Sequence, residues 1–143
     1  MYGRIEQECE QAGLPFRRPA RVPNTRRALL TAEFVRRHQP AAFDALDRSL
    51  FEAHFVENRP LDDPDVLDAL VKAAGGDAAA ARDGVESGAM SDALRESMEA
   101  AMDANVTGTP AWLLDGRLLI PGAQPRDLFE IWVARLRERE PDR

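Results

Sequence analysis

Few side chains of this sequence could carry out chemistry, and the most reactive of them stands alone. A thiolate that attacks a disulfide needs a second thiol to resolve the mixed disulfide. Cys9 is the only cysteine among the 143 residues. It falls inside a predicted helix, away from the helix N-terminus that would acidify a thiol. We therefore expect no internal disulfide, and we interpret Cys9 as a small, partly buried apolar residue.

The remaining polar groups lack the spacing of a metal site or a hydrolase site. His38 and His54 are the only histidines and, with Cys9, they match no zinc-binding spacing. We interpret His38 as a helix-end residue that compensates the helix dipole, and His54 as a residue at the edge of the core. The three aspartates within residues 62–65 are explained by a helix start. The sequence therefore predicts no metal and no cofactor.

Seven arginines gather between residues 17 and 37, where Glu33 is the only acid. They are Arg17, Arg18, Arg21, Arg26, Arg27, Arg36 and Arg37. Such a cluster could bind an anion near a helix N-terminus. A solvated face that pairs with acids elsewhere explains it better, because the chain has 25 acidic and 19 basic residues. The net charge of −6 also argues against a nucleic-acid partner.

The composition is that of one ordinary globular domain, taken as residues 1–143. Hydrophobic residues make up 44% of the chain and charged residues 31%. No apolar run approaches the length of a membrane span. The first residues lack the basic and then apolar pattern of a secretory signal. We therefore expect a cytoplasmic protein with no membrane contact.

Helical periodicity dominates up to about residue 104, and a shorter β pattern follows. The predicted helices cover residues 2–12, 25–38, 40–57, 63–74, 77–85, 87–104 and 125–139. The helix at 40–57 is apolar over much of its circumference, Phe51 included, and Leu29 lies in the apolar row of the helix at 25–38. The inner row expected for the helix at 87–104 is Leu94, Met98, Ala101 and Met102.

A hairpin is predicted after the helix at 87–104. Asn105 stands where a left-handed residue would end the helix. Short apolar runs at 111–114 and 118–120 flank the Asp115-Gly116 turn signal. A two-stranded hairpin is marginal alone, so we expect a helix or further strands to cover it.

Three stretches, in this order, resemble the DsbA/FrnE-type branch of the thioredoxin-like family. Residues 105–110 (Asn-Val-Thr-Gly-Thr-Pro) resemble its Gly-Val-x-Gly-Val-Pro junction, and residues 120–125 (Ile-Pro-Gly-Ala-Gln-Pro) its approach to the last helix. Residues 23–25 (Pro-Asn-Thr) resemble the start of its first insert helix. The resemblance implies an α/β, predominantly helical, partial thioredoxin-like (DsbA-type) fold. It places a helical insert at 24–104 and a strand–turn–strand–helix unit at 105–139.

The resemblance also implies disulfide oxidoreductase chemistry that these residues do not complete. The family's first strand, its Cys-x-x-Cys turn and the following helix would lie before Met1, and Asn105 replaces the usual glycine. We therefore expect an oxidoreductase-like protein that, as this chain, lacks redox activity. The alternatives are a non-catalytic peptide- or protein-binding module, and a glutathione-type ligand site served by the arginine cluster.

Thr109 and Pro110 are the substrate-binding residues that the resemblance implies, and no catalytic residue is assigned. In the family the bond before this proline is cis, and the residue before it pairs with an extended peptide. Alternatively, Pro110 simply begins an edge strand, where proline is tolerated. The Thr109–Pro110 edge thus implies a possible peptide or protein partner. The resemblance further implies that the edge of strand 111–114 is unpaired or covered by another chain, so we expect a homodimer or a strand-exchanged pair.

Overall fold

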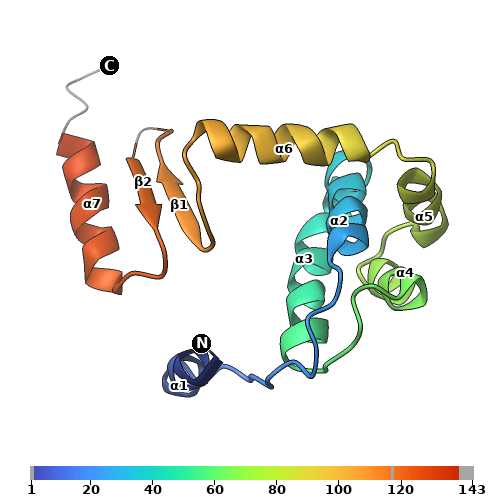
Figure 1. Cartoon of the computed structure of the whole chain (residues 1–143), viewed down its shortest axis with the longest axis horizontal. Coiled ribbons are helices and arrows are strands. Elements are labelled where there is room, and N and C mark those ends of the chain that lie inside the picture. The colour runs from blue at the N-terminus through green and yellow to red at the C-terminus, as the bar shows by residue number, and fades with distance from the viewer. Residues whose placement is uncertain (1, 117, 139–143) are drawn as a thin grey trace. The chain divides into compact units, whose positions relative to one another are not determined.

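A computed structural model describes residues 2–116 and 118–138 of the chain. The chain divides into two compact units, residues 1–95 and 96–143. The elements in order are α1 (Tyr2–Gln11), α2 (Arg26–His38), α3 (Pro40–Phe55), α4 (Pro64–Ala73), α5 (Ala78–Glu86), α6 (Ser91–Asp103), β1 (Ala111–Leu114), β2 (Leu118–Pro121) and α7 (Arg126–Glu138). The predicted order of helices, hairpin and closing helix is thus confirmed (Figure 1).

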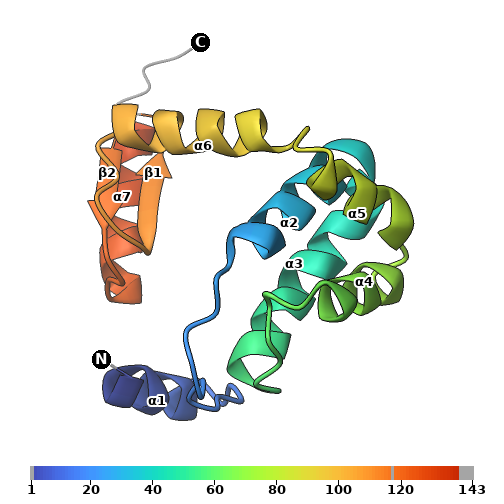
Figure 2. The ribbon, with the colours of Figure 1, turned by 45° about the vertical axis from the view of Figure 1, so that its right-hand side comes forward.

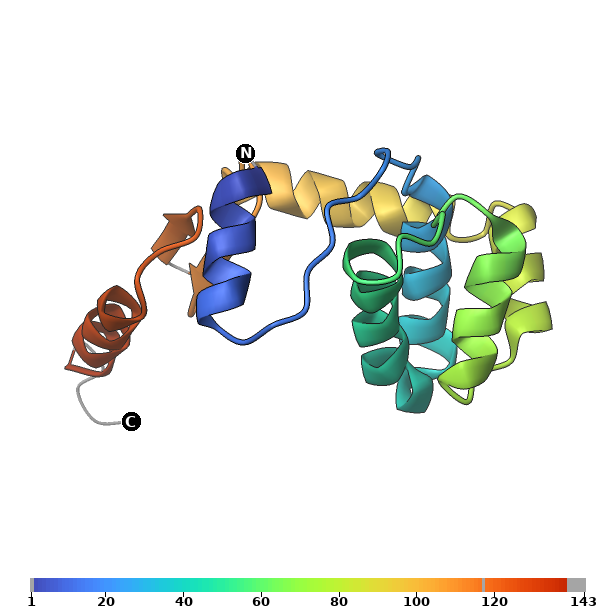
Figure 3. The same cartoon turned by 90° about the horizontal axis from the view of Figure 1, so that it is seen from below.

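The helical unit is a bundle of α2, α3, α4 and α5 (Figure 3). α2 packs against the other three helices, and α4 also packs against α3 and α5. Val35 and Leu46 have no exposed surface. Gly84 lets α5 approach α2, because a Cβ at this position would overlap the Phe34 ring. The buried core consists of Ala28, Val35, Ala42, Leu46, Leu50, Ala53, Leu61, Leu67, Leu70, Val71, Ala78 and Ala81.

Local sequence signals fix the ends of the bundle helices. The Asp63 carboxylate accepts a hydrogen bond from Asp65 N at 2.9 Å and so caps α4, and Asp77 caps α5 in the same way. Gly76 follows α4, where a Cβ would lie 2.6 Å from Gln39 Oε1. Glycine therefore leaves room for the Gln39 amide to bond both the N–H and the carbonyl of Asp77.

Helix α6 differs from its prediction in two ways. It begins at Ser91 and not at Ser87, because Ser87 still belongs to the end of α5 and Gly88, with φ +78°, terminates that helix. Met98 and Met102, predicted for the inner row, are 59% and 71% exposed. The apolar stripe is present in the sequence, but no element in the described part of the chain covers it.

The apolar patterns of α2 and α3 are also wider than the surfaces that become buried. Leu29 on α2 is 50% exposed and Phe51 on α3 is 60% exposed. Among the described elements α3 packs mainly against α2 and α4, so one of its sides stays open. The Phe51 ring instead lies along its own helix, 6.3 Å from the Phe55 ring.

The C-terminal unit begins with the end of α6, where Asn105 adopts φ +59° as predicted. Asn105 N donates to Met102 O and Val106 N donates to Ala101 O, both at 2.9 Å. These are the two hydrogen bonds of a Schellman cap, which turns the chain sharply out of the helix.

The two strands then form an antiparallel hairpin. Ala111 lies opposite Pro121 and Leu114 opposite Leu118. Asp115 adopts a positive φ at the turn, as the Asp-Gly signal predicts. α7 lies along one face of the hairpin (Figure 2). None of the helices in residues 2–116 and 118–138 has the length and hydropathy that a membrane span requires.

Candidate functional site

Thr109 and Pro110 lie at the entry to β1, and both are exposed. The peptide bond between them is cis. Gly122 N donates a hydrogen bond to Pro110 O at 2.8 Å, which ties the carbonyl of Pro110 to the β2 side. The two residues that the sequence assigns to substrate binding are therefore held at a solvent-facing junction by the backbone of the hairpin.

The hydrogen bond at Pro110 also fixes which backbone groups of β1 face away from β2. Residues along an antiparallel strand alternate between those that bond the neighbouring strand and those that point to the opposite edge. Because Pro110 bonds toward β2, Ala111 and Leu113 direct their N–H and C=O groups to the outer edge of β1. In the described part of the chain the sheet contains only β1 and β2, so this edge has no partner strand.

The two faces of the hairpin differ as well. The Trp112 ring packs edge-on against Phe129 of α7, with centroids 5.1 Å apart, and Ile120, opposite Trp112, is 4% exposed. This is the face that α7 covers in part, since Trp112 is still 48% exposed. Leu113 lies on the opposite face and is 47% exposed. An apolar side chain and an unpaired backbone edge thus occur together beside Thr109.

The arginine cluster is largely neutralised by acids from elsewhere in the chain. Arg18 pairs with Glu6 at 3.0 Å, and Arg27 pairs with Glu86 at 3.4 Å. Arg21 pairs with Asp62, 41 residues away, whereas Arg36 and Arg37 both pair with Glu33 on the same helix. The cluster is therefore mainly an ion-paired surface, as its composition suggested, and not one open anion site.

Glu33 is the most perturbed acid of this surface. Hydrogen bonds from the Arg36 and Arg37 guanidinium groups lower the pKa of Glu33 to about 2. The Arg21 guanidinium similarly holds the pKa of Asp62 below its usual range. Both acids are carboxylates at neutral pH, so each holds its arginine partner in a fixed position.

The other candidate residues belong to the unit of residues 1–95, whereas Thr109 and Pro110 belong to the unit of residues 96–143. Cys9 is half-buried on α1. His38 ends α2, stacks on the Phe34 ring at 4.5 Å and lies 3.1 Å from Phe34 O. Within the described residues no group of histidine, cysteine and acidic side chains could hold a metal ion.

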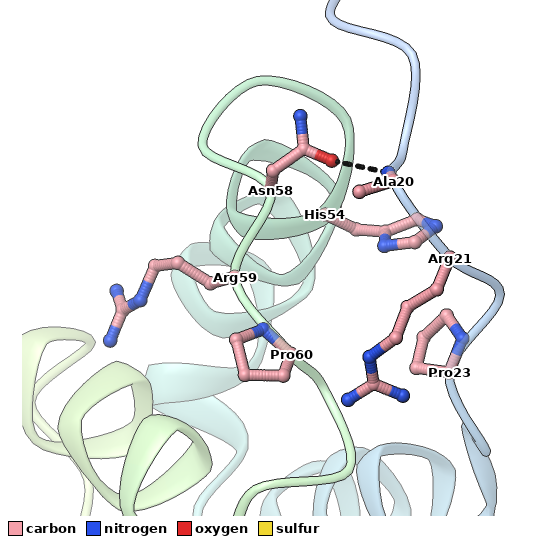
Figure 4. A pocket seen from close by; sticks show the side chains of 7 residues that line it. All are labelled: Ala20, Arg21, Pro23, His54, Asn58, Arg59 and Pro60. Carbon is pink, nitrogen blue, oxygen red and sulfur yellow. Dashed lines mark hydrogen bonds between the residues drawn. The ribbon is translucent and has the colours of Figure 1, made fainter.

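One feature of the helical unit was not found from the sequence. A cavity of about 250 Å³ lies between the connector before α2 and the end of α3, with His54 and Asn58 in its wall (Figure 4). Asn58 adopts φ +58° and bonds Ala20 N, 38 residues away. An asparagine in a Glu-Asn-Arg-Pro loop could have indicated a left-handed turn, but not its distant partner.

Comparison with known proteins assigns the fold. The family model of the DSBA-like thioredoxin domain matches residues 1–132. The chain belongs to the DSBA-like thioredoxin domain family. A relative from Bacillus subtilis (strain 168), "Uncharacterized protein YwbO", is 32% identical over 82 residues. That match covers 57% of this chain and 40% of the relative, so the chain spans well under two thirds of the relative's length.

Membership of the DSBA-like thioredoxin family confirms both the resemblance and the fold class inferred from the sequence. The family is of the thiol–disulfide oxidoreductase type. In this member the chain contains one cysteine, so it holds no Cys-x-x-Cys pair. Its described residues form the helices α1–α6, the β1–β2 hairpin with the Thr109–Pro110 junction before it, and α7.

Proposed function

We propose that this DSBA-like chain recognises an extended polypeptide along Thr109, Pro110 and the outer edge of β1. We further propose that, as this chain, it performs no thiol–disulfide exchange. The observation that carries the first proposal is the unpaired β1 edge beside the exposed Thr109–Pro110 junction. The second rests on the single cysteine, because exchange needs one thiol to attack and another to resolve the mixed disulfide.

Strand addition suits this edge physically. Ala111 and Leu113 offer outward N–H and C=O groups, and a polypeptide that pairs with them gains main-chain hydrogen bonds without any sequence requirement. Leu113 is 47% exposed, so an added strand could also cover its side chain. A polypeptide substrate of general sequence is what such a surface favours.

The binding proposal can be tested with two matched variants. Leu113 and Leu119 lie opposite each other, so both direct their backbone groups away from the partner strand, one at each edge of the hairpin. Leu113→Pro removes the outward N–H of β1, and Leu119→Pro removes that of β2. Proline is tolerated at such edge positions, so both hairpins should persist.

The probe is an unfolded polypeptide with alkylated cysteines, and binding is followed by tryptophan emission. Trp112 and Trp132 are the only tryptophans, and Trp112 is 48% exposed on β1. Losing one backbone hydrogen bond costs about 1 kcal/mol, so Leu113→Pro should weaken binding about fivefold. Leu119→Pro should bind as the parent chain does. Equal binding by all three chains would refute the proposal.

The redox proposal has a separate test. The parent chain should reduce insulin disulfides only at the background rate, and Cys9→Ser should leave that rate unchanged. Robust turnover that disappears in Cys9→Ser would show that Cys9 is a redox group after all.

A second occupant of the same edge is another copy of this chain. An exposed strand edge with apolar residues beside it favours association between copies. We therefore propose a homodimer through β1 as the alternative to a peptide partner. Sedimentation should detect the dimer in the parent chain and lose it in Leu113→Pro, and a monomer at high protein concentration would exclude it.

A further inference from the structure

The cavity in the helical unit is a defined site that the peptide-binding proposal does not use. It measures about 250 Å³ and is lined by the connector before α2 and by the loop after α3. The lining residues are Ala20, Arg21, Pro23, His54, Asn58 and Arg59, with Pro60 beside them (Figure 4). None of them is acidic.

The walls of the cavity are held in place by hydrogen bonds across long sequence separations. Asn58 Oδ1 accepts from Ala20 N at 3.0 Å, and Asn58 Nδ2 donates to Arg18 O at 3.4 Å. Arg17 N donates to Phe55 O at 2.6 Å. The connector is therefore fixed against the end of α3, and the cavity does not depend on a single side chain.

Arg21 is the cationic group of this site. Its Nη1 and Nη2 atoms bond the two Asp62 carboxylate oxygens at 2.8 and 2.6 Å. This end-on pairing fixes the guanidinium in place. It does not use the Nε–H, so that edge of the guanidinium can still donate to another group. Figure 4 shows the Arg21 side chain extending past Pro23 on the same side of the cavity as His54.

His54 supplies a second hydrogen-bonding group. Its ring has no hydrogen-bond partner among the described residues, and burial lowers the pKa of His54. A neutral imidazole retains one N–H donor. His54 lies in the last turn of α3, where free carbonyls would favour a cation. However, two of these carbonyls already accept hydrogen bonds: Ala53 O from Arg59 N at 2.8 Å, and Phe55 O from Arg17 N. They are therefore not free to favour a cationic His54.

Free hydrogen-bond donors, and not a net charge, favour an anion at this site. Arg18, Arg21 and Arg59 are each paired with an acid. These pairs leave the Arg21 Nε–H and the His54 N–H as donors. We propose that this cavity binds a small oxyanion, the carboxylate or phosphate group of a small molecule, through the N–H groups of Arg21 and His54.

The test uses the full chain and follows the imidazole signals of its two histidines by NMR. Sodium acetate and sodium phosphate are titrated separately, with sodium chloride keeping the ionic strength constant. The His54 signals should shift and saturate in at least one series, and the anion that saturates identifies the group bound. His38, on the exposed end of α2, should show no saturation. Failure of His54 to saturate with either anion overturns the proposal.

Two variants assign the effect to the cavity. Arg21→Lys keeps the positive charge next to Asp62 but removes the Nε–H and the planar guanidinium. The anion concentration at the midpoint of the titration should therefore rise about tenfold. Arg26→Lys is the matched control on the exposed start of α2 and should not change the midpoint. Equal weakening by both variants would mean nonspecific charge screening and would overturn the site. His54→Gln, followed through the Ala20 amide signal, should also bind more weakly, and unchanged binding would exclude His54.

Discussion

Asn105 provides the most direct test of how the chain enters the Thr109–Pro110 junction. The residue has φ +59°, and the bonds from Asn105 N to Met102 O and from Val106 N to Ala101 O require this left-handed conformation. A Cβ in this region costs an ordinary residue about 1–2 kcal/mol, glycine pays nothing, and asparagine tolerates it better than most. Stability at the end of α6 should therefore follow the order Gly, Asn, Ala, Val at this position.

The expected magnitudes follow from that order. Asn105→Gly should stabilise the cap by a few tenths to about 1 kcal/mol. Asn105→Ala should destabilise it by about 1 kcal/mol, and Asn105→Val by more, because a β-branched residue at positive φ is a genuine outlier. A change of 1.4 kcal/mol corresponds to about a tenfold change in the opening equilibrium.

Amide hydrogen exchange at Val106 measures this opening, because its N–H forms the longer-range bond of the cap. After correction for intrinsic rates, exchange should slow in Asn105→Gly and accelerate in Asn105→Ala and Asn105→Val. Gly76 N bonds Val71 O at 2.9 Å at the end of α4 and serves as an internal control that should not change. If all four residues at position 105 give the same Val106 protection, the left-handed conformation is not what holds the cap.

The remaining predictions concern the helical unit. Leu46→Ala, at a site with no exposed surface, should cost about 2–5 kcal/mol in urea unfolding, whereas Leu29→Ala, at a half-exposed site, should cost far less. Asp63→Ala should lower the free energy of unfolding by about 1 kcal/mol, because Asp65 N would lose the side-chain acceptor that caps α4. The hydrogen bond from Arg36 is the main cause that lowers the pKa of Glu33 from 4.5 to about 2. The stability that the Glu33 carboxylate gives to the fold is therefore complete above pH 4.5 and is lost as the pH falls toward 2. In urea unfolding, Glu33→Gln should therefore lower the free energy of unfolding by about 1 kcal/mol at pH 7 and by much less at pH 2.5.

Features that depend on neighbouring residues were predictable from the sequence. The Asp63 cap, the left-handed Asn105 and the Asp115-Gly116 turn each follow from the preference of one residue type for one local geometry. The Thr109–Pro110 junction was found because its spacing to the strands matches a family pattern. Each of these needs only a few consecutive residues, so tertiary packing had little opportunity to override them.

Features that depend on distant partners were not predictable in the same way. The apolar spacing of Met98 and Met102 indicates that one face of α6 suits burial, but it cannot say what covers that face, and both side chains are exposed in the structure. The cavity beside His54 requires Asn58 to meet Ala20, a contact across 38 residues that no local pattern encodes. The sequence likewise predicted that acids elsewhere pair with the arginine cluster, but not which acids, because Glu86 is 59 residues from Arg27.

The two occupants proposed for the β1 edge can be separated by competition. A peptide and a second copy would both use the outward N–H and C=O groups of Ala111 and Leu113, and each of these groups can pair with only one strand. Binding of the unfolded polypeptide should therefore dissociate the homodimer, and the apparent affinity for the polypeptide should fall as the chain concentration rises. Tryptophan emission gives the bound fraction, and sedimentation gives the dimer fraction in the same samples. A ternary assembly of dimer and polypeptide would show that the two do not share this edge, and the dimer would then have to form through another surface.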